Sequence, residues 1–105
     1  MNIRFEYLYR DAGNFKKWGD VVFSNPRGIT PEAATKMAEE ALIDSNYFAA
    51  TKAGVPDLHF PDYNEQLDHG LHEMHGFFPT NETPTDREDR TVEEFVRSFR
   101  AASVA

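Results

Sequence analysis

Three of the four histidines in this chain lie close together, and two carboxylates lie among them. His69, His72 and His75 follow one another at three-residue intervals, flanked by Asp68 and Glu73. Imidazoles and carboxylates are the ligands that Zn²⁺ and related transition metals accept. This stretch is therefore the candidate metal site of the sequence. It would support either simple metal binding or the chemistry of a small metal-dependent hydrolase.

The spacing of these residues does not match a strong metal motif. It is not HExxH, in which two histidines on one helical face bind zinc. In a strand, His69 and His75 would lie ~20 Å apart at ~3.3 Å per residue, too far to share one ion. Glu73 with either histidine supplies two ligands, whereas zinc sites use three or four protein ligands. The remaining ligands would have to come from upstream residues, namely Asp57, His59 or Asp62.

The backbone around these histidines has two interpretations. A helix would align Asp68, His72 and His75 on one face, but Gly70 and Gly76 each weaken a helix by ~1 kcal/mol relative to alanine. A strand would add a third member to a hairpin that is marginal by itself. We therefore predict a strand near 70–78. A short helix near 62–67 is expected to precede it.

Other catalytic chemistry finds little support in the sequence. The chain has no cysteine, so it offers no thiolate nucleophile and no disulfide. GxSxG, P-loop and GxGxxG motifs are absent as well. A histidine base would need a serine or threonine within hydrogen-bond reach, and no spacing singles one out. The sequence leaves enzymatic activity open but favours its absence, and it indicates no cofactor other than the transition metal of the candidate site.

Several elements that would position this stretch have clear local signals. Residues 2–10 alternate apolar and polar side chains, and residues 15–24 repeat the pattern after a DAGN turn, which predicts an antiparallel hairpin. Residues 31–43 form a predicted helix, with Thr30 as the N-cap. A capping box, TVEE, begins a second predicted helix at 92–102. A short helical turn is expected to end at the glycine of AATKAG.

Together these elements predict one α+β domain spanning residues 1–105. The hairpin and a third strand would form a small antiparallel sheet, with the two main helices packed on one face. Such an arrangement buries the apolar side of every element. The predicted core consists of Ile3, Phe5, Tyr7, Val21, Phe23, Met37, Ala41, Leu42, Phe95, Val96 and Phe99.

The net charge of −7 is concentrated in the middle of the chain. No Lys or Arg lies between Lys52 and Arg87, a stretch that contains seven acidic residues. This argues against nucleic-acid binding, which rewards clustered cations. It is compatible with a basic partner, a cation or mimicry of a polyanion. With neither a signal peptide nor an apolar membrane span, a cytoplasmic location is expected.

The stretches FEYLYRDAGNFKKWGDVVFSNP, PDL, DHGLHEMHGF and TVEEF resemble a group of small uncharacterised bacterial proteins. The resemblance implies a compact stand-alone bacterial protein and carries no activity or site residue. We therefore expect an interaction or accessory module that contacts another protein, itself a monomer or weak dimer. The alternatives are a metal-binding protein or metal-dependent hydrolase that uses the histidine stretch, and an acidic polyanion mimic.

Overall fold

The N-terminal hairpin follows the alternation of its side chains. In the computed structural model, which describes residues 1–61 and 70–102, β1 (Asn2–Arg10) pairs antiparallel with β2 (Lys16–Phe23). The register runs from Ile3 opposite Phe23 to Arg10 opposite Lys16. Asn14, with φ 67°, takes the left-handed conformation in the turn, one of the residue types that tolerate it. The predicted hairpin is confirmed.

The sheet has four antiparallel strands in the order β2-β1-β4-β3, rather than the three expected. β4 (His72–Thr80) is the strand predicted near 70–78, and it pairs with β1 along its length. β3 (Tyr47–Phe48) adds two residues to the other side of β4. A strand this short has no periodicity that a sequence can reveal. The predicted helix near 62–67 lies outside the described residues.

The helices begin where their caps predict. In α1 (Pro31–Ala41), the Thr30 hydroxyl accepts a hydrogen bond from the Ala33 amide at 3.1 Å. α2 (Ala50–Ala53) is the expected short turn, closed by a left-handed Gly54 at φ 74°. α3 (Val92–Ala102) carries the reciprocal capping-box bonds between Thr91 and Glu94. None of the helices in the described residues is long and apolar enough to span a membrane.

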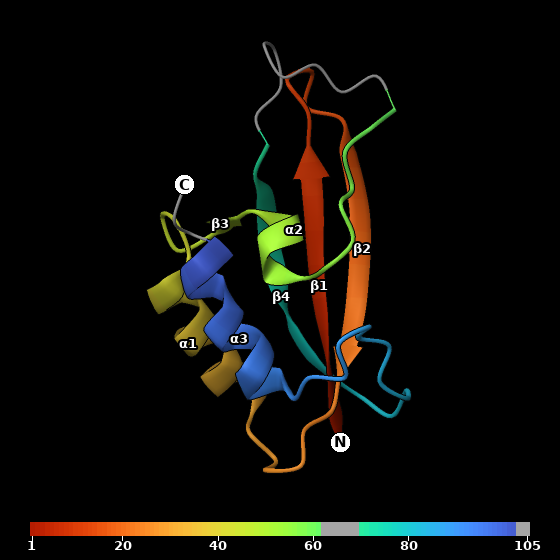
Figure 1. Ribbon diagram of the computed structural model, residues 1–105, viewed down its shortest axis with the longest axis vertical. Coiled ribbons are helices and arrows are strands. Elements are labelled where there is room, and N and C mark those ends of the chain that lie inside the picture. The colour runs from red at the N-terminus through yellow and green to blue at the C-terminus, as the bar shows by residue number, and fades with distance from the viewer. Residues whose placement is uncertain (62–69, 103–105) are drawn as a thin grey trace.

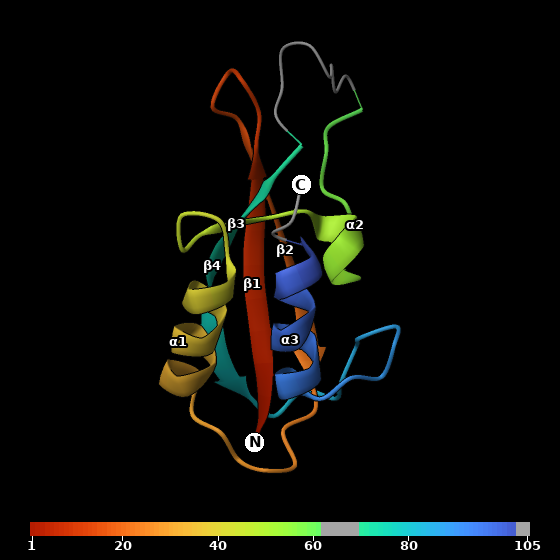
Figure 2. The same ribbon diagram turned by 60° about the vertical axis from the view of Figure 1, so that its left-hand side comes forward.

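The core lies on the side of the sheet to which β1 turns its aromatic residues. The centroid of the Phe5 ring lies 4.9 Å from that of Phe95 and 5.7 Å from that of Phe99, which places α3 against this side. Figure 2 shows α1 and α3 on either side of β1. Ala34 and Ala38 of α1 belong to the same buried cluster. That both main helices pack on one face of the sheet stays a prediction.

Most of the predicted core residues are buried, but Met37 is not. Its side chain is 39 % exposed, whereas Ala34 and Ala38 are fully buried. These two alanines are four residues apart and define the inward stripe of α1, which leaves Met37 on its flank. Ala41 is only partly buried. The burial of Met37 was therefore a wrong prediction, because a helix that packs through alanines lies too close to its neighbours to admit a longer side chain.

Residues 54–61, here called the connector, cover the part of the hairpin that lies beyond the helices. Figure 1 shows the connector leaving α2 and running toward the hairpin turn in front of β2. The Tyr7 hydroxyl donates a hydrogen bond to the Pro56 carbonyl at 2.7 Å. Leu58 packs on Gly19 so closely that a Cβ there would lie 3.0 Å from the leucine side chain. The connector is thus fixed to the sheet at two points.

Candidate metal centre

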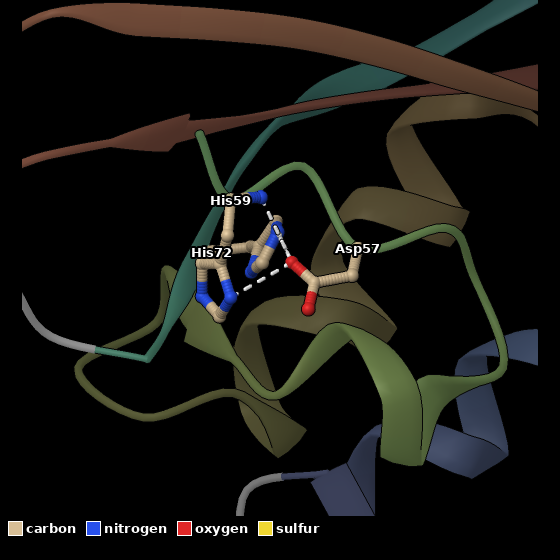
Figure 3. A group of neighbouring side chains, drawn as sticks. All are labelled: Asp57, His59 and His72. Carbon is tan, nitrogen blue, oxygen red and sulfur yellow. Dashed lines mark hydrogen bonds and ion pairs between the residues drawn. The ribbon is translucent and has the colours of Figure 1, made fainter. Parts of the chain in front are cut away.

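Two histidines and one aspartate converge where the connector meets β4. Asp57, His59 and His72 each offer one ligand atom, and these atoms lie within 4.8 Å of one another. Asp57 and His59 project from the connector, whereas His72 projects from β4 (Figure 3). Segments that are separated in the sequence therefore supply one set of donors, and this set is the candidate metal centre.

His72 is the buried member of the cluster. It is 1 % exposed, and the centroid of its ring lies 5.2 Å from that of Tyr9 and 6.0 Å from that of Tyr7. Its Nε2 accepts a hydrogen bond from the Leu58 amide at 2.9 Å, which requires a lone pair on that nitrogen. Packing and this bond together aim Nε2 at the connector. The same lone pair is the one that a metal ion would use.

Asp57 and His59 form the solvent-facing side of the cluster. Asp57 Oδ1 accepts the His59 backbone N–H at 2.8 Å, so the carboxylate holds the local turn. The same oxygen lies 3.0 Å from His59 Nδ1 and 3.5 Å from His72 Nε2. The Asp57 side chain is 41 % exposed and that of His59 is 20 % exposed. An ion can therefore reach the cluster from the Asp57 side.

The structure separates the residues of the predicted site. Only His72 joins the cluster, whereas Asp68 and His69 lie outside the described residues. Glu73 instead accepts a hydrogen bond from Arg10 Nε at 2.9 Å. His75 packs edge-on against Trp18 on the opposite side of the sheet, with ring centroids 5.0 Å apart. The structure does not bring Glu73 and His75 into the cluster.

A β-bulge in β4 explains how His72 and Phe77 can both face the core, while His75 points to the other side of the sheet. Glu6 of β1 lies opposite Gly76 and the next residue, Tyr7, lies opposite Met74, so His75 is the extra residue of β4. A bulge breaks the alternation that would otherwise carry through the strand, and glycine often marks its position. His72 and Phe77 are both buried although they are five positions apart in the strand. Strict alternation would have placed them on opposite sides.

No protein-family model matches the chain, and no curated protein or solved structure matches it either. The resemblance to small bacterial proteins is not tested by these comparisons. The site must therefore be argued from its own geometry.

Replacing Tyr7 with phenylalanine tests whether the connector positions the cluster. Burial raises the pKa of Tyr7 well above its usual value, so the hydroxyl stays protonated and donates to Pro56. We expect Tyr7→Phe to lower the free energy of unfolding by ~1 kcal/mol in urea titrations. Faster hydrogen exchange should be confined to the connector. An unchanged Leu58 amide exchange rate would show that this bond does not hold the connector.

Proposed function

We propose that this protein binds a divalent transition metal ion, such as Zn²⁺, through Asp57, His59 and His72. The supporting observation is the convergence of three ligand atoms within 4.8 Å at the junction of the connector and β4. Two imidazoles and one carboxylate are a donor set used for zinc and for non-haem iron. Mg²⁺ and Ca²⁺ prefer oxygen ligands and should bind far more weakly.

Within residues 1–61 and 70–102, three ligands converge, which is the number typical of an open zinc site. Structural zinc sites are normally closed by four protein ligands, whereas sites with three leave a position for water or another molecule. The exposed side of Asp57 lies where that position would face solvent. The hydrolase predicted from the sequence would need this open position, and it remains a narrower proposal than metal binding itself.

Metal binding would exchange one partner of His72 for another. The Nε2 lone pair that accepts the Leu58 amide in the metal-free protein cannot also coordinate an ion. The Leu58 amide should therefore lose this bond when the metal binds. Its NMR resonance and its hydrogen-exchange rate would report on binding at His72 specifically.

Titration with Co²⁺ and Zn²⁺ tests the proposal directly. The untagged protein should bind about one equivalent of Co²⁺, with visible absorption bands that Zn²⁺ removes. His59→Gln should weaken the affinity at least ~10-fold, because outer partners of metal ligands alone account for ~10–100-fold. His75→Gln is the matched control, since His75 is exposed and packs against Trp18 instead. It should leave the affinity unchanged.

If His59→Gln and His75→Gln weaken the metal affinity equally, the ion binds at another place. If no metal binds at any concentration below ~1 mM, the proposal is refuted. The shift of the Leu58 amide provides an independent check. If Zn²⁺ binds without moving this resonance, His72 is not a ligand.

The other functions predicted from the sequence stay predictions. For the polyanion mimic, three of the four described carboxylates of the acidic stretch give no support, because Glu73, Glu82 and Asp86 each pair with an arginine. For the interaction module, the exposed Trp18 beside a sheet edge gives a specific surface to test. That surface is independent of the metal centre.

A further inference from the structure

β2 presents an unpaired edge over the half of the strand nearest the hairpin turn. It is the terminal strand of the sheet, and its alternate residues bond to β1. The backbone N–H and carbonyl of Val22 point outward, away from β1. The Thr85 Oγ1 accepts a hydrogen bond from the Val22 N–H at 2.9 Å, and the Thr85 backbone N–H donates to the Val22 carbonyl at 2.9 Å. Because the direction of the backbone groups alternates along the strand, the N–H and carbonyl groups of Lys16, Trp18 and Asp20 also point away from β1. Within residues 1–61 and 70–102, no backbone group bonds to that side of these three.

The side chains along this edge have a symmetric pattern. Lys16, Trp18 and Asp20 alternate with the buried side of β2, so all three project from the sheet face opposite the core. All three are exposed, and Trp18 is 54 % exposed. Trp18 lies at the centre, with a cation two residues before it and an anion two residues after it. A strand with this pattern is complementary to a second copy of itself in antiparallel orientation.

We propose that two copies of the protein associate through this edge, with β2 pairing antiparallel to β2 of the partner and Trp18 opposite its own copy. Lys16 then lies opposite the partner's Asp20, and Asp20 lies opposite the partner's Lys16. Each chain contributes outward backbone groups of three residues to the new ladder. The result is a continuous eight-stranded sheet with twofold symmetry, formed from two four-stranded sheets.

The length of the free edge favours this register. Thr85 occupies the edge at Val22, so the unpaired segment runs over residues 16–20, and Trp18 is its midpoint. A shift by two residues would leave positions unpaired and would remove both charge pairs. A shift by one residue would turn the paired side chains of the two copies to opposite faces of the sheet. Only pairing centred on Trp18 uses the whole segment and opposes unlike charges.

Local charge makes a second copy an acceptable partner despite the overall charge of −7. The contacting segment carries Lys16, Lys17 and Asp20, whereas the acidic stretch follows Lys52 in the sequence. Charged residues on a sheet edge normally discourage pairing. Here they discourage every alignment except the one in which each lysine meets an aspartate. They therefore select against unrelated strands and in favour of this dimer.

Charge reversal and its compensation test the proposal. Sedimentation of the purified protein should show a monomer–dimer equilibrium at concentrations up to ~1 mM. Lys16→Asp places like charges together at both symmetric positions and should raise the dimer dissociation constant about tenfold. Asp20→Lys should do the same. The double variant Lys16→Asp with Asp20→Lys restores both pairs in reversed polarity and should recover the dimer.

Lys17→Asp is the matched control, because it makes the same charge change on a side chain that points to the opposite face. It should leave the dissociation constant near that of the unaltered protein. A monomer at every concentration would overturn the proposal. A dimer that responds equally to Lys16→Asp and Lys17→Asp, or that the double variant fails to restore, would overturn it as well.

Disulfide trapping gives a second readout, and the chain has no cysteine of its own to interfere. Opposed residues of a hydrogen-bonded antiparallel pair have Cα atoms ~5.5 Å apart, which a disulfide can bridge. Trp18→Cys should therefore cross-link two chains under mild oxidation. Lys16→Cys places the two sulfurs about four residues, or ~13 Å, apart and should not. Equal cross-linking of both variants would rule out this register.

Discussion

Replacing Arg90 with alanine is expected to lower the free energy of unfolding by about 3–5 kcal/mol, because it leaves a buried carboxylate without its cation. The Asp86 side chain is 1 % exposed, and that of Arg90 is 12 % exposed. The guanidinium donates from Nε and Nη2 to the two carboxylate oxygens, each at 2.9 Å. A bidentate pair of this kind is among the stronger ionic interactions in proteins.

Arg90 also ties three parts of the fold together. It donates to the carbonyls of Ala53 at 2.7 Å and Gly54 at 3.1 Å, at the end of α2 where the connector begins. Its guanidinium carbon lies 5.2 Å from the centre of the Phe95 ring of α3. Loss of Arg90 therefore frees the start of the connector, and the candidate metal centre should become more mobile along with it.

Urea unfolding at neutral pH measures the effect. Arg100→Ala is the matched control, because Arg100 is an exposed arginine of α3, and its replacement should change the stability by less than ~0.5 kcal/mol. A loss below ~1 kcal/mol for Arg90→Ala would show that Asp86 and the two carbonyls find other partners.

The difference in unfolding free energy between the unaltered protein and Arg90→Ala should shrink in acid. Burial alone would raise the pKa of Asp86, but hydrogen bonds from the Arg90 side chain and backbone lower it below its usual value. A lowered folded-state pKa stabilises the protein above the unfolded pKa, and this stability is lost as the pH falls through the folded pKa. In the variant, the unpaired carboxylate destabilises the fold only while charged. The gap between the two unfolding free energies should therefore narrow as the pH falls toward ~4 and then through the lowered pKa of Asp86. The part that comes from the Ala53 and Gly54 carbonyls does not titrate and should remain.

The elements that local signals specify are those that the sequence predicts well. The hairpin follows from alternation on either side of a turn, and both main helices follow from their caps at Thr30 and Thr91. Each signal lies within a few residues of the structure it determines. β3 was missed because its two residues pair only after β4 is in place. Its existence depends on the tertiary structure rather than on its own sequence.

The candidate metal centre, in contrast, is not specified by local sequence signals. The sequence identifies Asp57, His59 and His72 as chemically suitable, yet nothing local brings the first two to the third. The connector has no periodicity, and its path depends on the Tyr7 hydroxyl and on the space above Gly19. Alternation along β4 turns His75 away from His72, and the bulge then brings Phe77 back to the face of His72. A site formed by an irregular segment and an interrupted strand follows from packing, which a pattern of residue types does not encode.

Zn²⁺ should stabilise the protein by an amount that depends on its concentration, because an ion that binds only the folded state shifts the unfolding equilibrium. At a free concentration 100-fold above the dissociation constant, the gain is ~2.7 kcal/mol. Urea unfolding with and without Zn²⁺ measures this gain. It also separates the role of His72 as a ligand from its role in the core.

His72→Leu and Asp57→Asn should respond differently. Without metal, His72→Leu leaves the Leu58 amide without its acceptor and should cost ~1–3 kcal/mol. Asp57→Asn retains an oxygen for the His59 amide, so its metal-free stability should be nearly unchanged. Both variants should lose most of the gain from Zn²⁺, since each removes a proposed ligand. If Zn²⁺ stabilises His72→Leu as much as the unaltered protein, the ion binds elsewhere and His72 serves the fold alone.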